Sequence, residues 1–437
     1  MSMLIIYALV LIGMGLWDRR TGRQFEEYVL TGRRNGTVLV TSGLLATVLG
    51  ASATMGVIQL AWQVGFPAFW WLGVGAIGFV IQSIFLSKKL FQFKVFTLPE
   101  LTQVLLGKEA QLALAIMIGV GWLGVIAAQF VAAAKIVQVL SGFSWEVSLI
   151  WVVAVIYTYT ALGGNSVIVK TDLLQLIVLT VSVVLCLGYL LTVHPIPLQN
   201  LKPVFVNESF GFSKWFYFFI IVGAGYVICP ILYTRVFAAK SVQVAKRSLF
   251  LSAGGLVLLS ACIVGIGIWA QSYLPYLNGQ DIFALIVERW LPPWLGFFLI
   301  IGLLSAVISS ADACLIVIAM ILEKDILKKQ RVKGVRWMMF VASLVAFGLA
   351  GWKQEILPLL LIAYAIFSAG AAPPLSVALF GNRKLLPERK KMVLLALSIG
   401  GVMGLIGSLM EKDMFVLAGF FISLSISLWA FYGKETV

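Results

Sequence analysis

The sequence is poor in the residues that soluble enzymes use for chemistry. It contains one histidine, His194, and its four cysteines form no Cys-x-x-Cys pair. A Ser-His-Asp triad or a histidine-rich metal cluster would therefore have too few partners. All four cysteines lie inside apolar runs, where we expect them to pack as small hydrophobic side chains. These absences predict that the chain is not an enzyme.

Charged residues are scarce as well. They make up 11% of the 437 residues, and 61% of the residues are apolar, whereas about a quarter of an ordinary soluble domain is charged. This composition excludes a soluble enzyme, a disulfide scaffold and a disordered chain. A membrane-spanning helix needs about 20 apolar residues, so about 13 helices would fill roughly 260 positions. We therefore expect an all-α polytopic protein of the plasma membrane.

Thirteen apolar segments bounded by charged residues are candidate transmembrane helices. The first has no basic residue before it and no small-residue cleavage site after it, which favours a helix over a signal peptide. The segments lie at about 2–17, 37–57, 66–87, 111–140, 145–163, 167–193, 214–237, 248–274, 294–322, 335–352, 355–381, 391–410 and 414–433.

The basic residues orient these segments. All but six of the 32 Lys and Arg residues lie in or beside alternate loops, at 18–36, 88–110, 164–170, 235–247, 323–336, 382–391 and after 433. The positive-inside rule places these loops in the cytoplasm, so we expect the N-terminus outside and the C-terminus in the cytoplasm. The loops are short and carry no aromatic residues among their charges, which argues against a nucleic-acid partner.

Two segments contain residues that weaken a helix near mid-membrane. Residues 46–56 are almost all small, with Gly50 and Gly56, and residues 223–230 combine two glycines with Pro230. Glycine and proline favour an unwound backbone there, whereas close packing of two helices through small residues is the alternative. Unwound backbone inside a membrane is tolerated where it lines a cavity or is buried in protein.

The two segments are the second and the seventh, so they begin two consecutive five-helix blocks of opposite orientation. Interrupted helices at matching positions of inverted halves indicate the substrate site of a transporter. We expect residues 1–36 to form an extra helix and loop, 37–193 the first repeat, 194–213 an extracellular loop, 214–381 the second repeat, and 382–437 two further helices.

One carboxylate lies well inside a predicted span. Asp312 follows Ser309 by three residues, so the two share a helix face. An acid inside the membrane is costly and indicates function, and hydroxyl, carbonyl and carboxylate oxygens suit a hard cation. The alternative is that Ser309 and Ser310 bond their own helix and that Asp312 is protonated. Asp172 lies one turn inside its segment, where it could also act as an N-terminal helix acid.

Segment positions also suggest which residues meet the solute. We expect Gly50, Ser52, Gln129, Tyr226 and Tyr364 to line its cavity.

Four stretches of the chain resemble the sodium/solute symporter family, whose members carry proline, pantothenate, sugars and sialic acid. They lie in the family's order along residues 40 to 330. They are Ala-Thr-Val-Leu-Gly-Ala at 46–51; Tyr-Thr-Ala-Leu-Gly-Gly at 159–164 with Lys170, Thr171, Asp172 and Gln175; Gly225 and Tyr226 with Pro230, Arg235, Ala238, Ala239 and Ser241; and Ser-Ser-Ala-Asp at 309–312 with Asp325. The resemblance implies a LeuT-type core of five plus five inverted helices.

The resemblance also implies a Na+ site between the first and eighth core helices. Its ligands would be the backbone carbonyls of Ala46, Leu49 and Ala306 and the hydroxyls of Ser309 and Ser310. Some members have a second sodium site, which in this chain falls on Asp172, Asp312 and Ala313. The carboxylate of Asp312 replaces a hydroxyl there and Ala313 offers none, so this second site would take a cation or a proton.

We therefore expect a secondary active transporter that carries a small organic solute with Na+ by alternating access, with the lipid bilayer as its surroundings. Two alternatives remain open. A proton-coupled carrier on the same fold would depend on Asp312, and a sensor with a transporter-like core would transport nothing.

Overall fold

The chain folds into helices throughout the part that is described. The computed structural model describes residues 2–18, 24–197, 205–277, 282–352, 354, 356–381 and 385–433, and no strand occurs in these ranges. Arg19 and Arg20, which follow the first predicted span, lie outside the described residues. The first half contains α1 (Ser2–Asp18), α2 (Phe25–Leu30), η1 (Thr31–Arg33), α3 (Thr37–Val48), η2 (Ser52–Gly56), α4 (Val57–Val64), η3 (Phe66–Phe69), α5 (Trp70–Ile81), η4 (Gln82–Leu86), α6 (Ser87–Phe93), α7 (Leu98–Leu106), α8 (Lys108–Ser141) and α9 (Trp145–Val193).

The second half continues in the same way, with 3-10 and π-helical turns again labelled η. It contains α10 (Phe212–Tyr217), η6 (Phe218–Val222), α11 (Gly223–Val227), α12 (Pro230–Phe237), α13 (Val242–Tyr273), α14 (Ile282–Arg289), α15 (Pro293–Ile321), η7 (Leu322–Ile326), α16 (Val332–Trp352), α17 (Ile356–Gly370), α18 (Ala372–Phe380), η8 (Pro387–Arg389), α19 (Lys390–Leu409) and α20 (Asp413–Tyr432).

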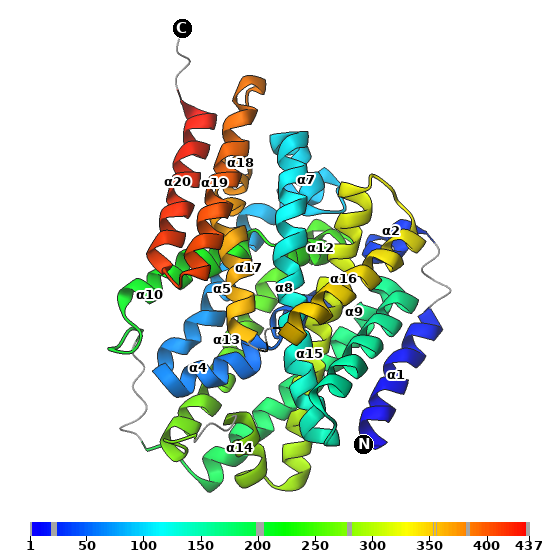
Figure 1. Ribbon diagram of the computed structural model, residues 1–437, viewed down its shortest axis with the longest axis vertical. Helices are drawn as coiled ribbons and strands as arrows, with labels where there is room; N and C mark the ends of the chain where they lie inside the picture. The colour runs from blue at the N-terminus through cyan, green and yellow to red at the C-terminus, as the bar shows by residue number, and fades with distance from the viewer. Residues whose placement is uncertain are drawn as a thin grey trace.

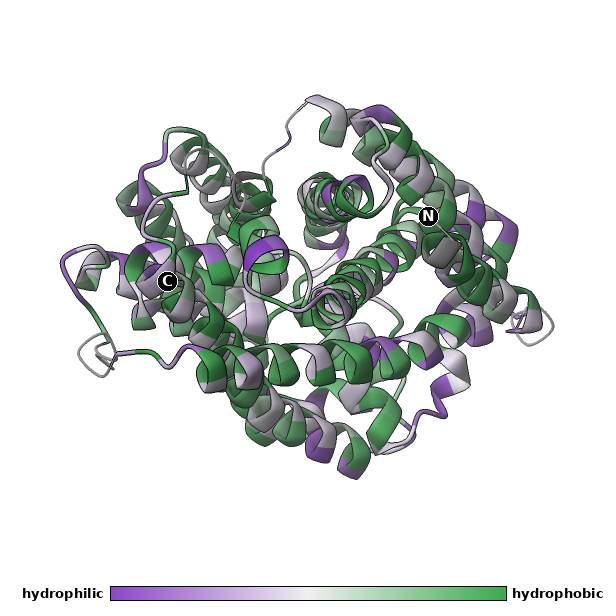
Figure 2. Cartoon of the chain, turned by 90° about the horizontal axis from the view of Figure 1, so that it is seen from below, coloured by the Kyte–Doolittle hydropathy of each residue, from purple (hydrophilic) through white to green (hydrophobic). Residues whose placement is uncertain are grey.

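Many of these helices have the length and composition of membrane spans. Among the described residues, nine are long and apolar enough to cross a membrane, and eleven if each of two bent helix pairs counts as one span. Hydrophobic residues, drawn in green, predominate along the helices (Figure 2). Counting α9 as two spans and adding the shorter α1 would give the predicted thirteen, a number that stays a prediction. The all-helical membrane architecture is confirmed.

The predicted loop at 164–170 is wrong in its conformation. The 49 residues of α9 would extend about 70 Å if straight, far more than a bilayer. Instead the chain turns at Gly164, whose φ of 62° and ψ of −152° are open to glycine, and the helix resumes directly. A side chain at Gly164 would also meet the ring of Tyr28. A single glycine therefore replaces the predicted loop.

A further break lies in the eleventh predicted segment, where none was expected. The segment divides into α17 and α18, which are bent by 45° about Gly370 and Ala371. Pro373 and Pro374 occupy the first turn of α18. Proline is well tolerated at a helix start but not in its interior, so these residues were a usable signal for the break.

Helix α15 forms the centre of the molecule. The most apolar 18-residue stretch of its span is entirely buried within the protein, whereas the corresponding stretch of α9 is 28% buried. Helices α3, α8, α9, α12 and α16 surround α15. Polar groups on α15 therefore face other helices rather than lipid. Along the long axis, α1 begins toward the lower end of the molecule and α20 finishes toward the upper end (Figure 1).

Candidate cation site and solute cavity

The first interrupted helix lies beside the middle of α15. Helix α3 ends at Val48, and Leu49 has non-helical angles of −81° and 43°. Helical turns resume at Ser52 on a path bent by 63°. This break confirms the predicted interruption in the second segment. It leaves the last carbonyls of α3 without the amide partners that a continuous helix would supply.

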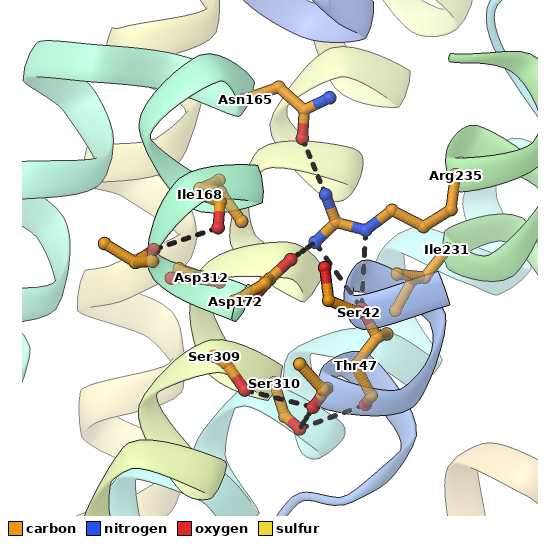
Figure 3. Close-up of polar contacts among 12 residues, drawn as sticks. Ser42, Thr47, Asn165, Ile168, Asp172, Ile231, Arg235, Ser309, Ser310 and Asp312 are labelled. Atoms are coloured by element: carbon orange, nitrogen blue, oxygen red, sulfur yellow. Dashed lines mark hydrogen bonds and ion pairs between the residues drawn. The ribbon is translucent and has the colours of Figure 1, made fainter. Parts of the chain in front are cut away.

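Two serines of α15 form hydrogen bonds with these carbonyls (Figure 3). The Ser309 hydroxyl lies 3.0 Å from the Ala46 carbonyl oxygen and 3.1 Å from that of Ala306. The Ser310 hydroxyl lies 3.2 Å from the Ala46 oxygen and 3.0 Å from the Thr47 oxygen. Each hydroxyl can donate its single hydrogen to only one of its two carbonyls, so the other carbonyl and the hydroxyl lone pairs remain available to a cation.

Four of the five predicted sodium ligands thus meet in one place, and their binding of Na+ stays a prediction; the alternative that the serines bond their own helix holds for Ser309 only. Ser309 bonds its own helix through Ala306 and also bonds across to α3. Leu49 is fully buried at the break itself, but none of the described hydrogen bonds joins it to the serines. The donors are carbonyl and hydroxyl oxygens, which suit a hard monovalent or divalent cation. The residues present therefore fit Na+.

A buried ion pair lies directly beside this cluster. The Arg235 guanidinium of α12 and the Asp172 carboxylate of α9 approach to 2.8 Å, with side chains 3% and 0% exposed. Arg235 also donates to Asn165 at 2.9 Å and points at the Thr47 hydroxyl from 3.4 Å (Figure 3). The absence of a side chain at Gly43 lets α3 approach the pair closely.

This position corrects the assignment of Arg235 to a cytoplasmic loop at 235–247. The loop begins only after α12 ends at Phe237, and the arginine is buried in protein. The ion pair also gives Asp172 a permanently charged partner, so Asp172 does not act simply as an acid at a helix N-terminus. Sequence reasoning missed this role because a basic residue near a span end is usually read as a loop charge.

Asp312 has a different partner. The Tyr159 hydroxyl of α9 donates to its Oδ2, while Oδ1 has no hydrogen-bond partner among the described residues. Nearby, the Tyr7 hydroxyl of α1 lies 3.0 Å from Ser305 Oγ and accepts from Gln175 Nε2 at 3.0 Å. A polar layer thus runs from α1 through α9 to α15. The contacts of the two tyrosines were not predicted, because nothing in the sequence shows which helices face each other.

A small cavity adjoins the serine cluster. It measures about 50 Å³, enough for a few water molecules. Thr47 and Ser310 line both the cavity and the serine cluster. All the residues predicted from segment position lie in its wall, namely Gly50, Ser52, Gln129, Tyr226 and Tyr364. Their contact with a solute stays a prediction.

Gln129 holds the broken backbone in place. Its Oε1 accepts from the Ala51 amide at 2.9 Å, which leaves its side-chain nitrogen for a ligand. A methyl group at Gly50 would lie 2.5 Å from Ser310 Oγ and 2.7 Å from Gln129 Oε1. Glycine is therefore required at position 50, where the serine cluster and the cavity touch.

The second interrupted helix forms the opposite wall of the cavity. Helix α11 ends at Val227, Ile228 and Cys229 are extended, and α12 starts with Pro230. This confirms the break predicted at 223–230. The freed carbonyl of Tyr226 accepts from Gln82 Nε2 at 2.6 Å, and that of Val227 accepts from the Tyr233 hydroxyl at 2.9 Å.

Two broken helices around a buried cavity, with an oxygen-lined cation cluster at one edge, define a secondary transporter. Residues 28–385 match the model of the sodium:solute symporter family. The chain belongs to this family.

Its relatives are ion-coupled carriers. A sodium/proline symporter of Haemophilus influenzae is 24% identical over 87% of this chain and 84% of its own length. A sodium/pantothenate symporter of Escherichia coli is 24% identical, with 92% and 88% covered. The predicted family and sodium-coupled solute symport are thereby confirmed, and the protein is a carrier and not an enzyme.

Solved structures agree on the fold. The substrate-bound, outward-open state of a Na+-coupled sialic acid symporter matches with a TM-score of 0.80 at 14% identity, covering 98% of this chain and 97% of that one. A nucleobase-cation-symport-1 family transporter in a closed conformation matches with a TM-score of 0.62 at 13% identity, covering 94% and 96%. Both support the predicted LeuT-type core.

Proposed function

We propose that Na+ binds between α3 and α15, and that a small solute binds in the adjoining cavity once it widens beyond the water-sized space of this conformation. The carbonyls of Ala46, Leu49 and Ala306 and the hydroxyls of Ser309 and Ser310 hold the ion. The observation that carries this proposal is the meeting of both serine hydroxyls with the last carbonyls of the broken α3. These oxygens are neutral, so the ion is held weakly enough to leave into a cytoplasm that is low in sodium.

The same contacts couple the ion to the solute. Na+ bridging α3 and α15 favours the conformation in which these helices lie close together, so it stabilises the cavity wall that Ser310 and Gly50 share. A ligand that prefers one conformation raises the affinity of every other ligand that prefers it. Solute binding therefore strengthens Na+ binding, and the loaded carrier reorients by alternating access.

The wall of the cavity suggests an uncharged or zwitterionic solute. Tyr226, Tyr364 and Trp122 provide aromatic surface, and Ser52 and Gln129 provide hydrogen-bonding groups. None of the described residues that line it is acidic or basic. Proline, the substrate in the name of several relatives, satisfies this description as a zwitterion.

The protein sits in the plasma membrane with its N-terminus outside and its C-terminus in the cytoplasm. The distribution of basic residues supports this orientation, and so do the opposite positions of α1 and α20 (Figure 1). Residues 37–193 and 214–381 form the two repeats, which begin with the two interrupted helices. Residues 194–213 form an extracellular loop between them, and residues 1–36 and 382–437 are additions outside the core.

Asp172 and Asp312 are the second site for a cation or a proton. The observation that favours a proton-coupled carrier as the alternative is the full burial of Asp312, whose Oδ1 has no hydrogen-bond partner among the described residues. Replacing Na+ by choline at constant pH separates the two. Uptake falls to background if Na+ drives the carrier, and it persists if a proton does.

The experiment for the sodium site uses purified protein in proteoliposomes. A thermal-shift screen of amino acids, organic acids, vitamins and sugars, with and without Na+, first identifies the solute. Ser309→Ala combined with Ser310→Ala then abolishes Na+-stimulated uptake while insertion is unchanged. Ser343→Ala, a buried serine of α16, serves as the control. Normal Na+-stimulated uptake by the double variant would refute the site.

A further inference from the structure

A second cavity lies beyond the end of α15, away from the transport site. It measures about 750 Å³ and opens where η7 turns into α16 beside α2 (Figure 1). Its wall includes Phe25 of α2, Arg331 and Lys333 at the start of α16, and Trp337 one turn further on. Because α15 and α16 both have the character of membrane spans, the turn between them lies at a membrane surface.

One side of this cavity is positively charged. Arg331 and Lys333 lie in its wall and are exposed, and Lys329, which is exposed as well, precedes Arg331 by two residues just outside the wall. Among the described residues, neither lysine has an acidic partner within ion-pair distance, and Arg331 uses only its Nε, on Glu323 at 3.0 Å. The remaining guanidinium donors and both ammonium groups are therefore available to an anion.

The one acid in this wall is already compensated. The Glu323 carboxylate is fully buried, is paired with Arg331 and packs tightly against Gly334 in the first turn of α16. The partial positive charge of a helix start stabilises a carboxylate in that place. The cavity therefore keeps an excess of positive charge.

The other side is apolar and continues along the lipid-facing surface of α16. Trp337 is 59% exposed and stacks on Phe340 with ring centres 5.5 Å apart. Val341 and Leu344, one and two turns beyond Trp337, are exposed in the same direction at 36% and 51%. A basic pocket thus leads directly into a hydrophobic stripe as long as part of an acyl chain.

We propose that this cavity binds an anionic phospholipid, with its phosphate at Arg331 and Lys333, the charge of Lys329 beside the cavity, and one acyl chain along Trp337, Val341 and Leu344. Basic pockets between transmembrane helices at a membrane surface bind acidic head groups, and each lysine near the surface strengthens this binding about fivefold. A free phosphate would use only the basic side, whereas the lipid uses both.

The test uses the full-length protein, delipidated in detergent, with dioctanoyl phosphatidylglycerol as the probe. Binding is measured by native mass spectrometry and by thermal shift. Lys329→Gln with Lys333→Gln weakens binding about 25-fold, whereas Lys246→Gln with Arg247→Gln, an equal loss of exposed charge on α13, changes it less than about twofold. Both lysines are exposed, so the melting temperature without lipid is unchanged.

A second pair of variants tests the apolar side. Trp337→Ala weakens binding of phosphatidylglycerol several-fold, whereas Trp352→Ala, at the other end of α16 and 82% exposed, has no effect. Dioctanoyl phosphatidylcholine, glycerol 3-phosphate and inorganic phosphate give little protection. Equal binding of phosphatidylcholine, equal protection by a free phosphate, or equal losses of binding in the two double variants that remove basic charge would overturn the proposal.

Discussion

Arg235 and Asp172 form an ion pair of 2.8 Å in the interior of the protein, beside the end of the broken α3. The pair joins α12, from the second interrupted helix, to α9, and its arginine also faces Thr47 of α3. A positive charge that is part of the chain therefore already neutralises the acid at which a second cation would bind. Any second ion at Asp172 must compete with Arg235.

Breaking this pair from one side should be strongly destabilising. Arg235→Gln leaves a buried carboxylate without its partner, which costs about 3–5 kcal/mol. The loss of stability is measured as a fall of the melting temperature in detergent. The melting temperature is determined by size-exclusion chromatography after heating. Adding Asp172→Asn to the same protein should restore at least half of the loss, because no uncompensated charge then remains.

Lys214→Gln is the matched control, since it breaks the partly exposed pair of Lys214 with Asp413. Such pairs contribute about 0–1 kcal/mol, so this variant should melt close to the wild type. Equal losses in the two single variants, or no recovery in the double variant, would contradict the assigned role of Arg235.

Gly50 should be intolerant of even a methyl group. Gly50→Ala places a carbon against Ser310 Oγ and Gln129 Oε1, so it disturbs the cation cluster and the solute cavity together. We expect Na+ and solute affinities, both measured by thermal shift, to fall about tenfold or more. Gly188→Ala, at a helical position of α9 with open space around it, should leave both affinities unchanged; a normal Gly50→Ala protein would show that the two sites are separate.

Tyr159 should stabilise the protein through Asp312. Tyr159→Phe removes the hydroxyl that donates to this buried carboxyl group, and an unsatisfied buried polar group costs about 1–3 kcal/mol. The melting temperature should fall accordingly, while Na+-stimulated uptake persists. Tyr157→Phe, two residues earlier and in ring contact with Phe340, is the control. Loss of all uptake in Tyr159→Phe at an unchanged melting temperature would assign the tyrosine to transport instead.

The broken helices and the serine cluster could be predicted because each has a local signal. Gly50 and Pro230 weaken helices in their own segments, and Ser309 and Ser310 stand out as polar residues in an apolar run. The family motifs then indicated that these distant segments meet. Local chemistry together with a known topology was sufficient for this part of the molecule.

What could not be predicted depends on which helices face each other. Arg235 looked like a loop residue because its partners Asp172 and Asn165 are about 60 to 70 positions away in the sequence. The contact of Tyr7 with Ser305 joins residues almost 300 positions apart. Gly164 carries a signal, but the sequence does not distinguish a single sharp turn from a loop of several residues.

The most direct test of the central claim is equilibrium binding of 22Na+ to the purified protein, measured by scintillation proximity. The account predicts saturable binding to the wild type and to Ser343→Ala. It predicts at least a tenfold loss of affinity in the protein that carries both Ser309→Ala and Ser310→Ala. Unchanged 22Na+ affinity in that double variant would contradict a sodium site between α3 and α15.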